Sequence, residues 1–313
     1  MSSLRVASYN LYLGADLTVV FGVGSPQDME QQAAAVHAQV LATDFPGRAA
    51  AVARILVREQ VDVVGLQEVA RWTRVVEGVG GGSQSEVWLD FLEELVAALD
   101  RAGEAYDVHA CVPSFHGGSR LAGGEQLAVT GHNVVLVRSS GRVRVTATRT
   151  GAFRRTLDIP TGMPDVVLNV ARSWSWVDAE AVGTPFRFVN THTEAWDPGV
   201  RDTQRDELLA AVGEPDRPVV LVGDLNATPD EVCMPEVYVD AWEAAGDGGP
   251  GWTSGQAPDL DNPTSALAKR IDYVFVRAAV VTACRVVGGE PADQTTGGLW
   301  PSDHAGVVAD ITL

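Results

Sequence analysis

Short apolar runs recur along the chain, and none approaches the roughly 18 uncharged residues that a membrane-spanning helix needs. Runs of this length that end at polar residues are typical of buried strands. The runs at 4–9 and 61–67 indicate the first two strands, and from residue 106 onward strands dominate. These are predicted at 106–112, 133–138, 142–149, 164–177, 185–191, 218–223, 271–276, 280–287 and 306–312. We expect one domain over residues 1–313, built on two sheets.

Helical periodicity predicts the remaining elements. Apolar residues at helical spacing indicate helices over 48–60 and 86–101, with further helices at about 198–212 and 230–244. Residues 11–46 read as a long loop with a helical patch near 31–41, and loops of this size usually carry function. Gly78–Gly82 predicts a flexible surface turn, because it lacks the strand-turn-helix frame of a dinucleotide-binding loop.

The charge balance limits the partners of the chain. It has 41 acidic and 23 basic residues, a formal net charge of −18. This excess argues against a tight binder of nucleic acid or anionic membrane, since neither polyanion is attracted to it. An enzyme that meets phosphates through a bound cation is not excluded, because a divalent ion reverses the local sign of the charge. Lys269, the one lysine, precedes Arg270 and forms no Gly-Lys-Ser/Thr phosphate loop.

Cysteine usage and the first residues bear on the compartment. Cys111, Cys233 and Cys284 are widely spaced and form no Cys-x-x-Cys pair, which favours reduced thiols over disulfides or structural zinc. The N-terminal residues lead straight into a strand, and no signal peptide is visible. We therefore expect a soluble cytoplasmic protein without stable membrane association, and no protein partner is evident.

Polar side chains fall at the ends of six apolar runs. A carboxylate at the buried end of a strand is costly unless it is paired or bound to a metal. Each residue taken alone has an ordinary explanation, such as a turn cap or a salt bridge, but the repetition across six elements predicts one shared site. The residues are Asn10, Glu68, His192, Asp224 with Asn226, Asp272, and Asp303 with His304.

In this order the motifs resemble those of the endonuclease/exonuclease/phosphatase superfamily, which has the DNase I-like fold. The resemblance runs from residue 9 to residue 308. It implies an α+β fold, a four-layer α/β sandwich in which two packed mixed β-sheets are flanked by helices. The motifs are SYNLYLGAD around Asn10, GLQEV around Glu68, NTH ending at His192, GDLN ending at Asn226, RIDY around Asp272 and SDH ending at His304.

The resemblance implies a divalent cation as cofactor. Glu68 matches the glutamate that binds the catalytic Mg²⁺, Asn10 is a direct or water-mediated ligand beside it, and Asp303 lies near the metal. Asp16 is a further candidate neighbour. Mg²⁺ prefers oxygen ligands and keeps several waters, so one or two carboxylates and an amide suffice when substrate phosphate completes the shell. Mn²⁺ has overlapping ligand preferences and is an alternative.

The resemblance also implies the residues that act on the substrate. His192 matches a histidine that contacts the scissile phosphate, and Asn226 an amide that holds a phosphate oxygen. Asp272 matches the carboxylate that orients His304. Asp224 matches an aspartate that either positions the water or protonates the leaving oxygen. We hypothesise that Asp224 and His304 jointly activate water for in-line displacement at phosphorus; the imidazole either accepts a proton or, if charged, clamps the phosphate.

Substrate size is less constrained. The segment 113–131 carries one Arg, one Glu and one His and does not resemble a duplex clamp. Trp196 and Trp300, close in sequence to His192 and His304, are predicted to wall the cleft and contact substrate. Positive charge near the cleft can come from several arginines, each expected mainly in surface salt bridges: Arg71, Arg74, Arg120, Arg172 and Arg201.

The sequence therefore predicts a Mg²⁺-dependent phosphoesterase that hydrolyses a phosphodiester, with a small or single-stranded phosphate ester or nucleic acid as substrate. A sphingomyelinase-like phospholipid phosphodiesterase and a phosphomonoesterase are the alternative activities. A catalytically silent binding module of the same fold is the non-enzymatic alternative. Serine and cysteine hydrolases are poor candidates, because no Gly-x-Ser-x-Gly elbow is present and no cysteine adjoins the motifs.

Overall fold

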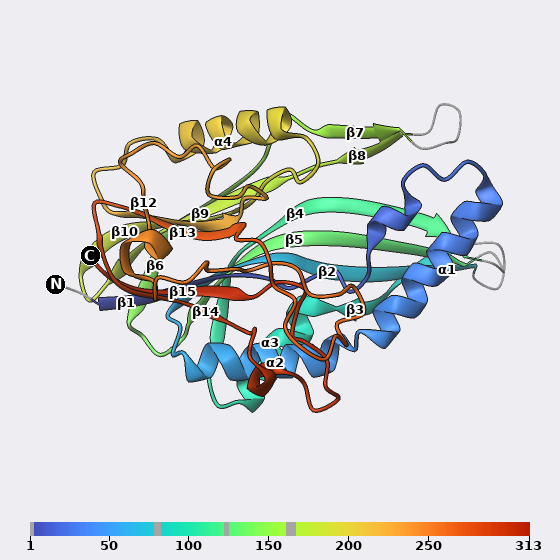
Figure 1. Ribbon diagram of the computed structural model, residues 1–313, viewed down its shortest axis with the longest axis horizontal. Coiled ribbons are helices and arrows are strands. Elements are labelled where there is room, and N and C mark those ends of the chain that lie inside the picture. The colour runs from blue at the N-terminus through green and yellow to red at the C-terminus, as the bar shows by residue number, and fades with distance from the viewer. Residues whose placement is uncertain (1–2, 78–82, 122–124, 161–166) are drawn as a thin grey trace.

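The computed structural model describes residues 3–77, 83–121, 125–160 and 167–313, and its strands form two large sheets (Figure 1). The first sheet runs in the order β14 (Val280–Val287), β15 (Gly306–Thr312), β1 (Ser3–Asn10), β2 (Val63–Glu77), β5 (Gln126–Arg138) and β4 (Tyr106–Arg120), with β3 (Ser83–Asp90) also paired to β2. The second runs in the order β12 (Val239–Asp240), β13 (Asp272–Arg277), β11 (Val219–Asp224), β10 (Thr184–His192), β9 (Ser173–Ala181) and β6 (Val143–Ala152). A separate pair joins β7 (Leu157–Pro160) to β8 (Val167–Val170).

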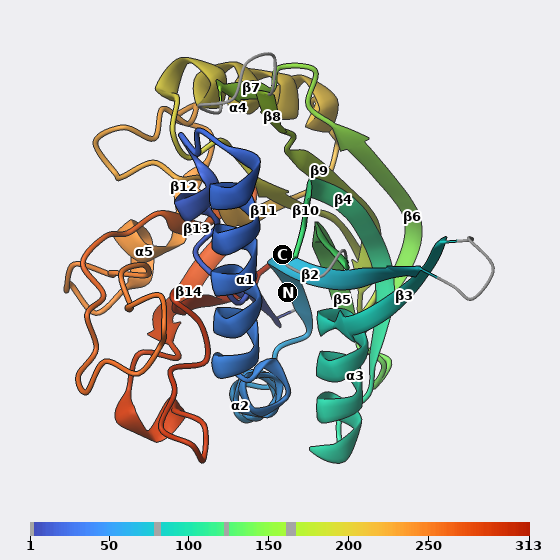
Figure 2. The same cartoon turned by 90° about the vertical axis from the view of Figure 1, so that its right-hand side faces the viewer.

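Helices cover the outer faces of the two sheets (Figure 1). The first sheet packs against α1 (Pro26–Ala42), α2 (Phe45–Arg58) and α3 (Phe91–Arg101), and α2 and α3 lie side by side (Figure 2). The second sheet packs against α4 (Pro198–Val212), which buries Leu208 and Val212. A third apolar core, which includes Val63 and Phe186, lies between the sheets. These four layers confirm the expected sandwich.

Each sheet contains a parallel pair that directs its carboxyl ends to one edge of the molecule. In the first sheet β1 pairs with β2, so that Asn10 lies opposite Gln67. In the second sheet β10 pairs with β11, and His192 lies opposite Asp224. The carboxyl ends of parallel strands meet at the same edge of a sheet, which is where open α/β sheets commonly bind ligands.

The sheets approach each other closely at Gly65 of β2. A Cβ atom there would lie 2.5 Å from Cγ2 of Val222 and 2.8 Å from the amide of Asn190. The Asn190 Nδ2 atom donates to the carbonyl oxygens of Leu66 and Val134, and its Oδ1 accepts a hydrogen bond of 2.7 Å from Gln67 Nε2. The absence of a side chain at residue 65 therefore lets buried hydrogen bonds join the two sheets directly beneath the strand ends.

Most predicted strands are confirmed, several with the same bounds. Strand β14 spans 280–287, β15 spans 306–312 and α4 spans 198–212, as expected. Strands β2, β4 and β5 are longer than predicted, because they continue into long antiparallel pairings beyond the edge of the sandwich. The segment 113–131, read as a loop, thus contains the ends of β4 and β5.

Two predicted helices are wrong in extent. Residues 86–90, expected in the helix 86–101, belong to β3, since they pair with β2. The helix begins only after Asp90, whose carboxylate caps it by accepting from the N–H groups of Leu92 and Glu93. The helix predicted at 230–244 is reduced to α5 (Ala241–Ala245), because Pro235 cannot continue a helix and Asp240 caps a new one.

The long loop predicted at 11–46 is largely structured. It contains the 3-10 helix η1 (Leu17–Val20), all of α1 and the start of α2. Ser25 caps α1 and Pro26 occupies its first turn, while Ala33, Val36 and Val40 bury one face. The predicted strand 164–177 divides into β8 and β9. Its first residues, 164–166, and the turn at 78–82 lie outside the described residues.

One further short helix precedes the loop at the site. A second 3-10 helix, η2 (Pro291–Asp293), precedes the loop that carries Asp303 and His304. Within the described part of the chain, no helix is both long and apolar enough to cross a membrane.

Gly65→Ala should destabilise the protein by about 1–3 kcal/mol, because the added methyl group overlaps Val222 and Asn190 where the sheets meet. Urea unfolding followed by far-ultraviolet circular dichroism would measure the change. Gly24→Ala is the matched control, since nothing lies within 4 Å of a Cβ at that position. Equal stability of the two variants would contradict the close approach.

Candidate active site

The predicted residues of the second sheet meet at the ends of β10, β11 and β13. His192 is opposite Asp224, and Asp224 is opposite Asp272. Asn10 reaches them from the first sheet, and its Nδ2 donates a hydrogen bond of 3.0 Å to Asp224 Oδ2. The Asn10 Oδ1 atom accepts from the backbone N–H of Tyr12. Asn10 thus joins the two sheets at the site.

Asp224 is buried and lies at the centre of this group. Its Oδ1 accepts from the backbone N–H of Asn226 at 2.9 Å. Its Oδ2 lies 3.6 Å from His192 Nε2 and 3.8 Å from His304 Nε2. Burial and the nearby Asp272 carboxylate raise the pKa of Asp224 to about 7. A carboxylate with such a pKa can accept a proton near neutral pH.

Asp272 and His304 form a buried pair. The Nδ1 atom of His304 lies 2.8 Å from Asp272 Oδ2. Burial opposes the charged imidazole, but Asp272, Asp303 and Asp224 outweigh it and raise the pKa of His304 well above its usual value. Ser302 steadies the loop, because its hydroxyl donates to the Asn10 carbonyl oxygen at 2.7 Å and accepts from the His304 N–H. The imidazole is therefore oriented with Nε2 towards Asp224.

Asn226 follows β11 in a left-handed backbone conformation, with φ of 48°. Its Nδ2 donates to the carbonyl oxygen of Thr193 at 3.0 Å, which uses one of its two amide hydrogens. The half-buried amide keeps a second hydrogen for a ligand.

Glu68 and Asp303 lie on the side of the site nearer the first sheet. Glu68 falls where the β2–β5 register shifts, with φ of 55°, and its Oε2 accepts from the Leu13 N–H at 3.0 Å. Asp303 follows Ser302, whose hydroxyl lies 3.3 Å from Asp303 Oδ1. Burial and the neighbouring Glu68 carboxylate raise the pKa of Asp303 to about 6. Two carboxylates that disfavour each other's charge are suited to a divalent cation.

Another group of residues at the site has the spacing of metal ligands. Ligand atoms of Asp224, Asp272 and His304 all lie within 4.8 Å of one another. Within the described structure, Oδ1 of buried Asp272 has no hydrogen-bond partner. However, a charged His304 already balances negative charge there, and its Nδ1 is engaged by Asp272. The pair Glu68 and Asp303 is therefore the better candidate for a resident cation.

Arg172 contributes to the site in a way that the sequence pattern did not reveal. Its NH1 lies 3.2 Å from His192 Nδ1. Because a guanidinium only donates, Nδ1 must accept, and the imidazole proton is on Nε2, which faces Asp224. Burial, Arg172 and His304 hold the pKa of His192 well below its usual value. His192 is thus a neutral donor. The buried Glu194 lies near Arg172, with Oε2 3.8 Å from Nε.

Arg48 is a residue of the site that sequence reasoning missed. It is fully buried in α2, and its NH1 donates to the carbonyl oxygens of Leu11 and Pro301, at 2.7 and 3.0 Å. The guanidinium thus holds together the loops that follow Asn10 and precede Asp303. A buried arginine at helical spacing has no distinguishing sequence signal.

The other predicted residues have different surroundings. Trp196 is 49% exposed, lies beside the site and packs edge-on against Phe21. Trp300 is fully buried with Tyr12 and Leu260, and its indole N–H donates to the Asn262 carbonyl oxygen, so it offers no surface to a substrate.

The carboxylate of Asp16 caps η1 by accepting from the Thr18 N–H. Of the remaining arginines, three form the expected ion pairs: Arg71 with Asp90, Arg74 with Glu125 and Arg201 with Glu231.

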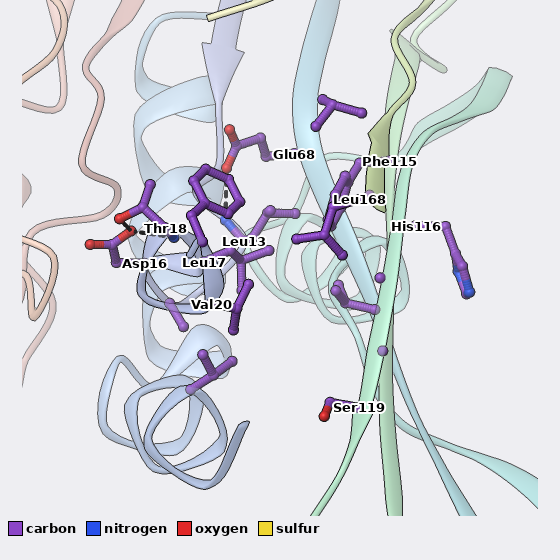
Figure 3. Close-up of a pocket in the computed structure, with 18 of the residues that line it drawn as sticks. Leu13, Asp16, Leu17, Thr18, Val20, Glu68, Phe115, His116, Ser119 and Leu168 are labelled. Atoms are coloured by element: carbon purple, nitrogen blue, oxygen red, sulfur yellow. Dashed lines mark hydrogen bonds between the residues drawn. The ribbon is translucent and has the colours of Figure 1, made fainter. Parts of the chain in front are cut away.

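A cavity of about 480 Å³ opens beside the site. Glu68, His192 and Asp303 are among its lining residues. Figure 3 shows Leu13, Leu17 and Val20 below Glu68, and Phe115 on the opposite side of the cavity. The cavity is mostly apolar, which the strand-end pattern did not predict, because its walls come from segments far apart in the sequence.

The chain is similar to known proteins over nearly its whole length. The model of the Endonuclease/Exonuclease/phosphatase family matches residues 7–304. Comparison with the curated proteins finds no match.

Solved structures share the fold. An endonuclease/exonuclease/phosphatase family protein from Bacteroides thetaiotaomicron is 21% identical, with a TM-score of 0.63 over 99% of this chain and 97% of that one. A mannosyl-6-phosphatase from the same organism is 20% identical, with a TM-score of 0.61 over 99% and 100%. D. rerio TDP2 complexed with single strand DNA product is 16% identical, with a TM-score of 0.60 over 100% of both chains. At sequence identities this low, the similarity to these structures shows only that the fold is shared.

Arg172→Met should destabilise the protein by about 3 kcal/mol, because it leaves the buried Glu194 carboxylate without its cation. It should also raise the pKa of His192, since the repulsion from Arg172 is lost. Thermal unfolding and nuclear magnetic resonance titration of His192 measure the two effects. Arg71→Met, which removes an exposed arginine from a 3.4 Å pair, is the control and should cost less than about 1 kcal/mol. An unchanged His192 titration in Arg172→Met would refute the contact.

Proposed function

The chain belongs to the Endonuclease/Exonuclease/phosphatase family, a family of phosphate-ester hydrolases, and from this premise we propose that it hydrolyses a phosphodiester with a bound Mg²⁺ or Mn²⁺ ion. The observation that carries the proposal is the convergence of two histidines on one buried carboxylate oxygen. Asp224 Oδ2 lies within 4 Å of Nε2 of both His192 and His304, beside the acidic pair Glu68 and Asp303. Acid, base and cation-binding groups are thus within reach of one phosphate.

The donor set fits a hard divalent cation. Glu68 and Asp303 supply carboxylate oxygens, and Asn10 Oδ1 has a second lone pair beyond the one that the Tyr12 N–H uses. Burial and the nearby Glu68 carboxylate raise the pKa of Asp303 despite the opposing charges of His304 and Arg48, and a divalent cation would favour the charged carboxylate. When bound, the cation would neutralise charge on the phosphoryl group and lower the cost of in-line attack.

The chain's own residues would bind and orient the phosphate. Neutral His192 presents an Nε2 hydrogen, held in place by Arg172. Asn226 presents its remaining amide hydrogen. Charged His304 presents Nε2, with Asp272 fixing the ring. These fixed donors point to where negative charge accumulates as water attacks, which is the arrangement that lowers a barrier electrostatically.

Asp224 is the group that would take the proton from the attacking water. Its pKa of about 7 makes it a stronger base than an exposed aspartate. The Nε2 atom of His304, 3.8 Å away, lies at the distance where one water could contact both side chains. Asp224 and His304 therefore act as a unit: Asp224 takes the proton of the water, and charged His304 binds the phosphate.

The proposal is tested by adding Mg²⁺ or Mn²⁺ to the purified protein with bis-p-nitrophenyl phosphate, p-nitrophenyl phosphate, plasmid DNA and sphingomyelin. We expect metal-dependent cleavage of the diester, with His304→Ala as the inactive control. Faster cleavage of the monoester would favour a phosphomonoesterase, and cleavage of sphingomyelin a phospholipid phosphodiesterase. Lack of turnover together with lack of metal binding by calorimetry would leave a silent binding module.

Asp224→Asn and His304→Gln should each lower kcat by ~10²–10⁴-fold, the usual contribution of acid–base groups. The double variant should be no slower than the slower single variant, because groups that act as a unit are not additive. Steady-state hydrolysis of bis-p-nitrophenyl phosphate gives all three rates. Full activity in Asp224→Asn would exclude Asp224 as the base.

A further inference from the structure

The cavity beside the site has walls from three separate parts of the fold. One wall comes from η1, α1 and the residue after η1, the second from β2, β4 and β5, and the third from β8. The apolar side chains that form them are Leu17, Val20, Phe21, Met29, Val36, Trp72, Phe115, Leu127, Val129, Leu168 and Val170. Open apolar surface of this kind usually marks a ligand site, because exposing it to water is unfavourable.

Residues of the candidate active site line the cavity. They include Glu68, His192 and Asp303, and Figure 3 shows Glu68 above Leu13, Leu17 and Val20. A ligand whose phosphate meets these residues would therefore extend its other part into the apolar region. The cavity volume of about 480 Å³ lies within the ~300–1,000 Å³ that is usual for small-molecule sites.

The charged side chains along the walls already have partners. Asp16 accepts hydrogen bonds from the N–H and hydroxyl of Thr18. His116 lies 3.0 Å from the Thr130 hydroxyl, and its side chain points away from the apolar group in Figure 3. Arg172 faces His192. A charged or hydroxyl-rich group would lose its water here with few partners in exchange, which is costly.

We propose that this cavity binds an uncharged apolar group, alkyl or aryl, that is esterified to the substrate phosphate. The inference rests on the proposed function and adds its substrate class: a phosphodiester of an apolar alcohol. Sugars and nucleosides match these walls poorly, because the few polar side chains on them, such as Ser114 with its unpartnered hydroxyl and Asn169, would leave most of their hydroxyl groups without hydrogen bonds. The chain's net charge of −18 is compatible with such a substrate, since a short ester carries little charge to be repelled.

The test uses p-nitrophenyl phosphodiesters whose second ester group is methyl, butyl, octyl or phenyl, each below its critical micelle concentration. We expect kcat/KM to rise by ~4-fold per buried methylene, so that burial of about half of the seven methylenes added from methyl to octyl already raises it by ~100-fold. The phenyl ester compares an aryl with an alkyl occupant. Cleavage of all esters at equal rates, or of the octyl ester only above its micelle concentration, would overturn the proposal.

Two variants place the effect in the cavity. Val20→Gln and Leu168→Gln put an amide on two of its walls and should lower the octyl-to-methyl ratio of kcat/KM by at least about tenfold. Val19→Gln and Val167→Gln are matched controls, because these neighbours are 39% and 54% exposed and do not line the cavity. Their ratio should stay at the wild-type value. An equal fall in all four variants would count against the cavity.

A binding measurement with alkyl phosphonates tests the cavity assignment independently of the proposed catalysis. Trp72 and Trp196 line the cavity, so their fluorescence should report binding of octyl phosphonate, which cannot be hydrolysed at the P–C bond. We expect octyl phosphonate to bind at least about tenfold more tightly than methyl phosphonate, with or without Mg²⁺. Tail-dependent binding without turnover of any ester would refute the catalysis and keep the cavity assignment. Turnover of the esters without tail-dependent binding would support the catalysis and refute the cavity assignment.

Discussion

The hydrogen bond from Asn10 Nδ2 to Asp224 Oδ2 is the contact on which the site depends. It joins the carboxyl end of a parallel pair in one sheet to the carboxyl end of a parallel pair in the other. A buried carboxylate needs partners, and Asp224 finds them in Asn10 and the Asn226 backbone. The same oxygen then faces two imidazoles. The sheets can meet in this register because Gly65 has no side chain and Asn190 satisfies the backbone groups beneath.

The two histidines of the site are held in opposite states by their neighbours. Asp272 favours the charged form of His304, whereas Arg172 and burial favour the neutral form of His192. Both present an N–H towards the same small region, one as a cation and one as a neutral donor. Under the proposed function, this division leaves Asp224 as the base and the pair Glu68 and Asp303 to hold a cation. That cation would locally reverse the acidic character of the chain where a phosphate would bind.

Much of this arrangement could be predicted from the sequence, because strand ends are marked by a change from apolar to polar residues. That signal was sufficient for Asn10, His192, Asp224 and Asp272. It failed where contacts between segments far apart in the sequence determine the secondary structure or the burial of a residue. Residues 86–90 became a strand because β2 offers them a partner, and Trp300 turned out to be core although it is close in sequence to His304.

Arg172 and the apolar cavity could not have been placed from the sequence for the same reason. Arg172 is distinguished from the other arginines by its burial and by its contacts with His192 and Glu194. The cavity arises where η1, α1, β4 and β8 happen to face one another, and none of these segments carries a motif of its own. Local sequence patterns predict which side chains lie at strand ends. They do not predict which segments, far apart in the sequence, line the cavity beside those strand ends.

The most direct test of this account is the position of a bound cation. Crystals soaked in Mn²⁺ give an anomalous diffraction signal that locates the ion without reference to activity. The account predicts a peak bound by Glu68 and Asp303, with Asp224 and His304 left free to act on water. A peak held only by Asp224, Asp272 and His304 would contradict it, because the proposed base would then be a metal ligand.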